Sequence, residues 1–380
     1  GREVSERSAD PQVNLFDVER EALARLPVPA RDYYCGGAND EITLRDNRAA
    51  YDRIALHYRV LRDVSQRDTS TAVLGAEVSL PVLIAPTAFH QMAHPDGELA
   101  TARAAQAART LMILSTLSTC EMEEVARAAR GAWWFQLYVY RDRGVTRELM
   151  QRAVSAGCKA IVLTVDAPVG GLRERDVRNR FALPPGLKMC NLRGAGQEHA
   201  GLEAEMGGVS GYFTRLLDPT LNWKDLDALA AALPVPLIVK GIVRADDAVR
   251  AREHGAAGIV VSNHGGRQLD TAPAPIEVLE RIATAIDHRL EIYIDGGVRR
   301  GTDVLKALAL GARAVLIGRP VLWGLACGGE AGVAHVLEIL RRELDVAMAL
   351  AGCRSLAEID VDLIRPPMPL PARPDRWRPA

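Results

Sequence analysis

Eight short apolar runs recur along this chain, and amphipathic helical patterns separate them. The runs are rich in Val, Ile and Leu, as is typical of strands buried on both faces of a parallel sheet. We expect strands at residues 82–85, 112–115, 134–137, 160–165, 237–240, 258–262, 291–295 and 314–317. Helical spacing lies between them at 97–108, 122–129, 146–156, 223–233, 245–254, 275–286 and 301–310. Eight strand–helix units joined by right-handed crossovers favour a (β/α)₈ TIM barrel, of the α/β class, over an open sheet.

Two regions depart from this alternation. The first is an N-terminal helical cap before the barrel, expected at residues 15–26, 30–34 and 38–51. The second is a long loop after strand 4, of about seventy residues, which far exceeds an ordinary connection. Its Gly-, Glu- and Ala-rich part at 189–214 is interpreted either as an active-site lid or as an insertion without a role. We expect a single domain at 15–366, a flexible N-terminus at 1–14 and a C-terminal tail at 367–380.

The bulk composition excludes several classes of function. The 380 residues have a formal net charge of -1, so nothing indicates nucleic acid or an anionic membrane as a partner. No apolar run approaches the length of a membrane span. The 6 cysteines are scattered without a CxxC pair, which is typical of reduced thiols in a cytoplasmic protein without a zinc site.

The segment IVVSNHGGRQLD, at residues 259–270, carries the most specific chemistry. A β-branched run ends at Ser262 and Asn263, and His264, two glycines and Arg267 follow it. Catalytic groups of a barrel lie at the C-terminal ends of its strands. Histidine exchanges protons near neutral pH, and arginine binds a carboxylate through two parallel hydrogen bonds. A base and an anion-binding residue are therefore expected here, whereas the segment taken alone would also fit a solvated histidine and a surface arginine.

Polar residues follow the other seven strands as well, and this convergence indicates one ligand site. DGGVR after the seventh strand and GR after the eighth supply glycine amides, Arg299 and Arg319, where barrels usually bind phosphate. Neutral hydrogen-bonding groups suited to a flat heteroaromatic ring follow earlier strands: Ser115, Gln136 and Thr164. Lys240 adds a positive charge that would stabilise a reduced flavin ring. The pattern predicts FMN as the cofactor.

With these segments in view, the chain resembles the FMN-dependent 2-hydroxy acid oxidases and dehydrogenases, among them glycolate oxidase, lactate oxidase and mandelate-oxidising enzymes. The resemblance rests on SNHGGRQLD, TVDAP, NRFALPP, KGI, DGGVRRGTDVLKALALGA and GRPVLWGL, and it runs from about Leu15 to Ile364. It implies that His264 is the catalytic base and that Asp166 pairs with it. The other catalytic residues that it implies are Arg267, Arg173, Tyr138 and Lys240.

The same resemblance implies two further sets of contacts. Flavin or phosphate contacts are expected at Ala85, Pro86, Thr87, Ala88, Ser115, Gln136, Thr164, Lys240, Ser262, Asp295, Gly297, Arg299, Gly318 and Arg319. The substrate pocket is expected at Tyr33, Leu117, Tyr138, Gly170, Arg173, His264 and Arg267. Members of the family also imply a homotetramer or higher homo-oligomer.

Two positions depart from the glycolate oxidases that the chain resembles. Leu117 stands where they carry a tryptophan, and Gly170 where they carry a leucine. Loss of an indole and an isobutyl group would open an apolar pocket for a larger substrate, such as mandelate or a ring-substituted mandelate. If neighbouring side chains refill the space, substrate choice would be unchanged.

The expected reaction is oxidation of an (S)-2-hydroxy acid to the 2-oxo acid, with oxygen as acceptor and hydrogen peroxide as product. The first alternative is a dehydrogenase that passes electrons to a quinone or a cytochrome, and the second is glycolate or lactate as the substrate. Ala88 favours the oxidase, since some dehydrogenases of the family have glycine there. A catalytically silent flavin-binding module is a further alternative, which the set His264, Asp166, Arg173 and Arg267 disfavours.

Overall fold

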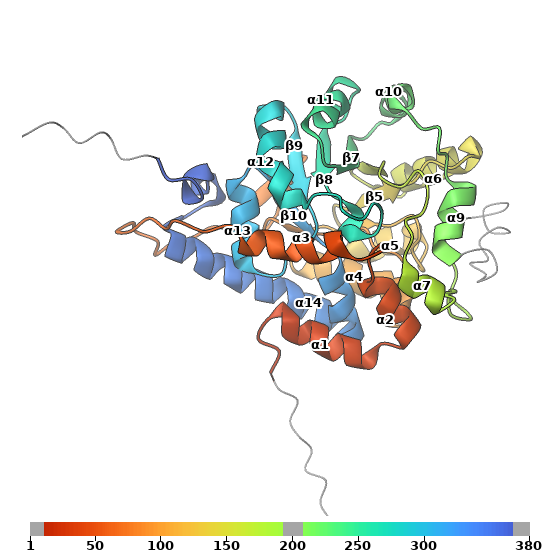
Figure 1. The fold of residues 1–380 in the computed structure, drawn as a ribbon, viewed down its shortest axis with the longest axis horizontal. Coiled ribbons are helices and arrows are strands. Elements are labelled where there is room, and N and C mark those ends of the chain that lie inside the picture. The colour runs from red at the N-terminus through yellow and green to blue at the C-terminus, as the bar shows by residue number, and fades with distance from the viewer. Residues whose placement is uncertain (1–10, 193–207, 368–380) are drawn as a thin grey trace, which may run out of the picture.

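A computed structural model describes residues 11–192 and 208–367, and these residues build a parallel eight-stranded barrel surrounded by helices (Figure 1). In the order in which they pair, the strands are β3 (Val82–Ile84), β10 (Ala314–Ile317), β9 (Glu291–Ile294), β8 (Gly258–Val261), β7 (Leu237–Ile242), β6 (Ile161–Thr164), β5 (Trp134–Leu137) and β4 (Ile113–Leu114). A parallel bridge between Ile84 and Met112 joins the two ends of the sheet. The predicted TIM barrel is confirmed.

Thirteen α-helices of the described residues surround this sheet or cap it. They are α1 (Leu15–Arg25), α2 (Val28–Cys35), α3 (Ile42–Asp52), α4 (Gly97–Ala107), α5 (Met122–Ala129), α6 (Arg143–Ser155), α7 (Glu174–Arg178), α9 (Gly208–Leu216), α10 (Trp223–Ala232), α11 (Ala245–Glu253), α12 (Pro275–Ile286), α13 (Gly301–Ala309) and α14 (Arg319–Ala351). The longest, α14, packs against α1, α4 and α13 and is kinked at Gly328 and Gly329. Within the described part of the chain, no helix is long and apolar enough to cross a membrane.

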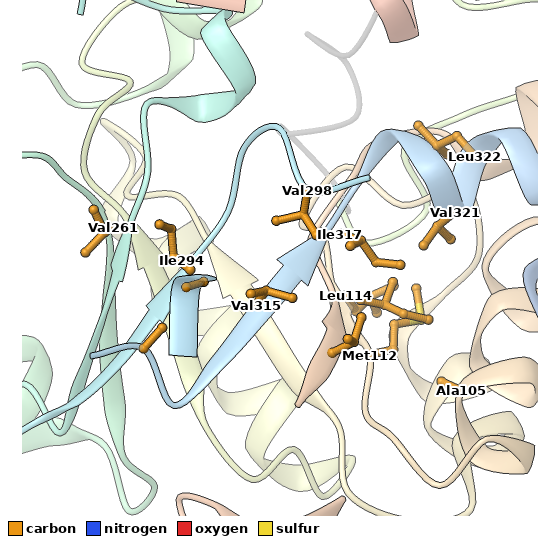
Figure 2. Close-up of a cluster of buried hydrophobic side chains, with 14 of the residues drawn as sticks. Ala105, Met112, Leu114, Val261, Ile294, Val298, Val315, Ile317, Val321 and Leu322 are labelled. Carbon is orange, nitrogen blue, oxygen red and sulfur yellow. The ribbon is translucent and has the colours of Figure 1, made fainter. Parts of the chain in front are cut away.

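The strands bury both faces, as their unbroken apolar runs predict. Alternate side chains fill the barrel interior, where Trp134 and Tyr293 meet edge to face with ring centroids 5.4 Å apart. The others point outward and pack against the helices; Figure 2 shows Val315 and Ile317 of β10 in this layer, near Val321 of α14. Because both faces of the strands are covered by apolar packing, the polar groups lie where the strands end.

A short hairpin was not expected from the sequence. Strands β1 (Thr71–Val73) and β2 (Ala76–Val78) pair antiparallel around Leu74 and Gly75, whose φ angles of 45° and 80° form the turn. Its side chains Val73 and Val78 join the interior cluster, and the Leu74 N–H donates to Glu291 at the start of β9. The hairpin therefore packs against the end of the barrel opposite the polar strand ends.

The N-terminal cap has three helices, but two of them begin elsewhere than predicted. Helix α2 begins at Val28 because Pro29, which lacks a backbone N–H, fits the first turn of a helix. Helix α3 begins at Ile42, four residues late, because Asn39 and Glu41 adopt positive φ angles of 46° and 57° that interrupt a helix.

The long connection after β6 is only partly as expected. Residues 208–214, predicted as irregular, belong to helix α9, which buries Val209, Tyr212 and Phe213 on one side. This correction follows from the i, i+3, i+4 spacing of those three side chains, which the glycines around them concealed. Residues 189–192 of the expected lid are described, and residues 193–207 lie outside the described residues, as do residues 1–10 and 368–380 of the predicted termini.

Candidate active site

The C-terminal ends of the strands surround one cavity with an empty volume of ≈ 1000 Å³, its mouth included. Residues from the predicted catalytic, cofactor and pocket sets line it together: Tyr33, Ala85, Pro86, Thr87, Ala88, Ser115, Leu117, Gln136, Tyr138, Thr164, Arg173, Lys240, His264, Arg267, Asp295, Gly297, Arg299, Gly318 and Arg319. Asp166 and Ser262 contact lining residues from behind. Gly170 is the exception and is treated below.

His264 and Asp166 form a hydrogen-bonded pair at this cavity. His264 Nδ1 lies 2.7 Å from Asp166 Oδ1, and its backbone N–H donates to the Ser262 hydroxyl. Because a carboxylate only accepts, we assign the proton to Nδ1, which leaves Nε2 as the free basic nitrogen. The positive φ of 61° at His264 places the residue in the sharp turn that ends β8.

Burial sets the protonation of the pair. It lowers the pKa of His264 below its ordinary value, since Asp166 only partly offsets the loss of hydration and Lys240 opposes the cation further. Burial by itself would raise the pKa of Asp166, but the charge and hydrogen bond of His264 together with Lys240 turn the net direction downward. The pair at neutral pH is therefore an ionised carboxylate beside a neutral imidazole, the state that a base requires.

Two arginines make this part of the cavity a site for an anion. The Arg173 side chain is 5% exposed, and its Nε and Nη2 have no hydrogen-bond partner among the described residues, although Nε lies 3.3 Å from Asp176 Oδ2. Arg267 donates through Nη1 to the carbonyls of Tyr33 and Gly36. Burial and the charge of Arg267 lower the pKa of Arg173. A buried cation with unused donors is complementary to a carboxylate.

Tyrosine rings and one phenylalanine complete this end of the cavity. The guanidinium carbons of Arg267 and Arg173 lie 4.9 and 5.6 Å from the centre of the Tyr33 ring, a cation–π arrangement. Tyr138 packs edge to face against Phe213 of α9, with centroids 5.1 Å apart. Burial raises the pKa of Tyr138, so its hydroxyl remains a hydrogen-bond donor. Sequence reasoning missed Phe213, because it lies in the segment that was expected to be irregular.

The middle of the cavity presents neutral hydrogen-bonding groups and one lysine. Gln136 donates through Nε2 to Thr164 Oγ1 at 3.0 Å, and its Oε1 accepts from the Thr116 backbone. These bonds fix the amide, which leaves an edge of polar atoms along the strand ends. Lys240 Nζ is 3.4 Å from Asp295 Oδ2, while Asp295 Oδ1 is buried with no hydrogen-bond partner in the described part of the chain.

Two further arginines line the cavity, Arg299 and Arg319, and the charge of Glu19 offsets only part of the effect of their burial. Arg319 donates to the backbone carbonyls of Tyr34 and Gly36, and Arg299 donates to its neighbour's carbonyl and lies over the Trp323 ring. Burial lowers the pKa of both guanidinium groups, which means that each loses hydration without full compensation. Such a pair beside glycines at the ends of β9 and β10 suits a phosphate.

One cavity is lined by two buried arginines beside glycines, by a hydrogen-bonding middle and by a carboxylate end that holds His264, Arg173 and Arg267. Together these groups match what a flavin mononucleotide and a small acid require. The model of the FMN-dependent dehydrogenase family matches residues 22–366.

The chain belongs to that family.

Relatives and solved structures agree with this assignment. The chain is 55% identical to an L-lactate oxidase of Nostoc sp. over 93% of this chain and 98% of that protein. It is 51% identical to glycolate oxidase 3 of Arabidopsis thaliana, over 91% and 94%, and 50% identical to 2-hydroxyacid oxidase 1 of Homo sapiens, over 92% and 96%. A crystal structure of mandelate oxidase with (S)-4-hydroxymandelic acid superposes with a TM-score of 0.86 at 44% identity, covering 91% of this chain and 96% of that one.

As a member of the FMN-dependent dehydrogenase family, the protein is an oxidoreductase that uses FMN to oxidise the CH–OH group of 2-hydroxy acids. The chain's residues fit this cofactor, because two buried cations, a fixed amide and the orphaned Asp295 oxygen all line the cavity. Within residues 11–192 and 208–367, no group of three or more His, Cys, Asp or Glu is placed to hold a metal ion.

Gly170 does not open the cavity as the sequence suggested. It is absent from the described residues that line the cavity, and a Cβ placed on it would lie 2.6 Å from the Ser210 Cα of α9. Helix α9 therefore fills the space that a missing leucine would leave. Leu117 does line the cavity and is 2% exposed, so of the two departures only this one lies at the cavity wall.

Proposed function

We propose that this protein oxidises (S)-2-hydroxy acids with an apolar or aromatic side chain, such as mandelate or a ring-substituted mandelate, and that oxygen is reduced to hydrogen peroxide. The observation that carries the proposal is that a base, an arginine pair and an apolar wall line one cavity. The relatives named above are oxidases, and mandelate oxidase shares the fold at 44% identity.

Each residue of the carboxylate end has a role in this proposal. Arg173 and Arg267 hold the substrate carboxylate, and the Tyr138 hydroxyl donates to a substrate oxygen. His264 Nε2 takes the proton of the 2-hydroxyl group, and Asp166 stabilises the imidazolium that forms. FMN, when bound, would supply the acceptor for the hydrogen and the two electrons of the C2–H bond that breaks. Lys240 would lie beside the flavin ring, where its charge would favour the reduced form.

Substrate choice in this proposal depends on Leu117 and Phe213. Both line the cavity, and Phe213 packs against Tyr138, which is assigned to the substrate. An apolar group that fits such a wall contributes roughly 1–3 kcal/mol of discrimination, or about ten- to two-hundredfold in kcat/KM. An apolar side chain on C2 of the acid should therefore be favoured over the hydrogen that glycolate carries there.

Steady-state oxygen uptake tests the proposal with glycolate, L-lactate, 2-hydroxyoctanoate and (S)-mandelate on the FMN-loaded protein. We expect (S)-mandelate or 2-hydroxyoctanoate to exceed glycolate by at least about tenfold in kcat/KM. Leu117→Trp should reduce the mandelate-to-glycolate ratio, since an indole fills the wall. Preference for glycolate in the parent protein, or an unchanged ratio in Leu117→Trp, would contradict the assigned specificity.

L-lactate is the second candidate substrate, because the Nostoc L-lactate oxidase shares 55% of its residues with this chain. It would use the same base and arginines with a methyl group at the apolar wall. The same panel separates the two candidates by which acid gives the highest kcat/KM. Rapid reoxidation by a quinone analogue with slow reoxidation by oxygen would instead indicate a dehydrogenase.

A further inference from the structure

A buried histidine lies behind the wall of the FMN cavity. Thr87, just after β3, lines the cavity, and its Oγ1 is 2.7 Å from Nε2 of His90. His90 is 0% exposed, and its other ring nitrogen, Nδ1, is 2.9 Å from Thr101 Oγ1 of α4. Its backbone N–H donates to the buried carboxylate of Glu98 at 3.1 Å. The imidazole is therefore fixed at both nitrogens, and one of them contacts a hydroxyl of the cofactor cavity.

We assign the protons of this group from the surrounding hydrogen bonds. The Thr101 hydroxyl donates to the Gly97 carbonyl, as hydroxyls in helices do toward the residue four positions earlier. Its oxygen is then free to accept from His90 Nδ1–H. Burial lowers the pKa of His90, and Glu98 offsets this only in part, so the ring is neutral and carries a single N–H. Nε2 is left without a proton and accepts the proton of Thr87.

We propose that His90 is a positioning residue that makes the Thr87 hydroxyl a hydrogen-bond acceptor toward the FMN cavity. A hydroxyl has one proton, and with that proton donated to Nε2 the Thr87 oxygen presents only lone pairs to the cavity. Two-electron reduction adds an N–H donor to a flavin ring at a position that carries a lone pair when oxidised. An acceptor that faces this position would therefore stabilise reduced FMN more than oxidised FMN and would raise the reduction potential.

This inference concerns the cofactor and holds whichever 2-hydroxy acid is the substrate. Its test is the reduction potential of bound FMN, measured by spectroelectrochemical titration of the FMN-loaded protein without substrate. In Thr87→Val we expect reduced FMN to lose about tenfold in binding relative to oxidised FMN, which for a two-electron couple is a fall of about 30 mV. Thr87→Ser, which keeps the hydroxyl, should restore the parent potential.

A double-mutant cycle tests the role of His90 itself. His90→Leu should lower the potential in the Thr87 background and should have no further effect in Thr87→Val, because the two side chains act through one hydrogen bond. Thr110→Val is the matched control: it removes a buried hydroxyl that bonds the Val82 carbonyl and does not line the cavity. It should cost thermal stability without changing the potential.

Two results would overturn the proposal. One is a parent-like potential in Thr87→Val, and the other is an equal effect of His90→Leu in both backgrounds. If His90→Leu does not fold, His90→Gln replaces it, because the glutamine amide oxygen can accept the Thr87 proton. In this variant the ratio of reduced to oxidised FMN binding should stay within about twofold of the parent ratio. A shift in His90→Gln as large as that of Thr87→Val would equally count against the role of His90.

Discussion

At the scale of single residues, burial decides which side chains can do chemistry. His264 and Asp166 are polar residues held where water is excluded, and their 2.7 Å hydrogen bond gives each a defined protonation state. Arg173 illustrates the same point for a cation, because its unused N–H groups are costly until an anion binds. Sequence motifs identified these residues. Only burial explains why His264 is a neutral base while the neighbouring arginines are charged.

Replacement of His264 by Ala should abolish flavin reduction by substrate while FMN stays bound. General-base catalysis contributes typically 10²–10⁴-fold, and stopped-flow measurement of flavin bleaching should show a loss of about that size. The flavin absorbance of the purified variant is the control for cofactor retention. A reduction rate within about tenfold of the parent, a barrier change of only ~1.4 kcal/mol, would show that another group is the base.

The pH profile of kcat/KM should follow the lowered pKa of His264. A base acts only when unprotonated, so activity should rise with pH through that pKa and be level near neutral pH, with its acid limb below the ordinary histidine value of about 6.5. In Asp166→Asn the limb should move to still lower pH, because the Asp166 charge raises the pKa of the imidazole. A limb that moved upward in that variant would contradict the assigned pair.

At the scale of elements, helix α9 contributes to the site in a way that no motif indicated. It supplies Phe213 to the cavity and places Ser210 against Gly170. The Tyr140 and Tyr212 hydroxyls, 2.7 Å apart, fix the helix to the end of β5. The wall of the cavity is therefore formed by a helix from the long connection as well as by the barrel.

Gly170→Leu should destabilise the fold without widening or narrowing the substrate pocket. A side chain there meets the Ser210 backbone, and such overpacking costs typically 1–3 kcal/mol, which thermal unfolding would detect as a lower Tm. Gly131→Leu is the matched control, because a Cβ at Gly131 has no atom closer than 3.8 Å. An altered substrate ratio with parent-like Tm in Gly170→Leu would restore the hypothesis that Gly170 shapes the pocket.

At the scale of the whole molecule, one exposed apolar surface has no role in the barrel. The chain between α3 and β1 projects beside the end of α14 (Figure 1), where the Arg59 N–H donates to the Ala351 carbonyl. On this segment Tyr58 and Leu61 are 70% and 103% exposed, and Leu350 of α14 is 72% exposed. Exposed large apolar side chains that gather in one region are typical of protein interfaces.

We expect a homotetramer, or a higher homo-oligomer, in which this surface is buried between copies. Leu61→Asp should shift the protein toward smaller species, because the interface would then bury an unpaired charge. Light scattering at micromolar concentration would measure the change, and Val177→Asp, at a 70% exposed position on α7, is the control. A monomeric parent protein would refute the assembly, and an unchanged oligomer in Leu61→Asp would refute this interface.

The sequence by itself determined the barrel, because the period of its apolar runs and the lengths between them leave few other ways to bury eight strands. It also located most residues that line the cavity, since in this topology every strand ends on the same face. It did not determine how Gly170, Phe213 and His90 function, because each depends on contacts between segments far apart in the chain or hidden in weak patterns. Ser210 fills the space beside Gly170, and Thr101 and Glu98 fix His90 behind Thr87. Only the tertiary structure decides such matters, because packing and hydrogen bonding act between neighbours in space.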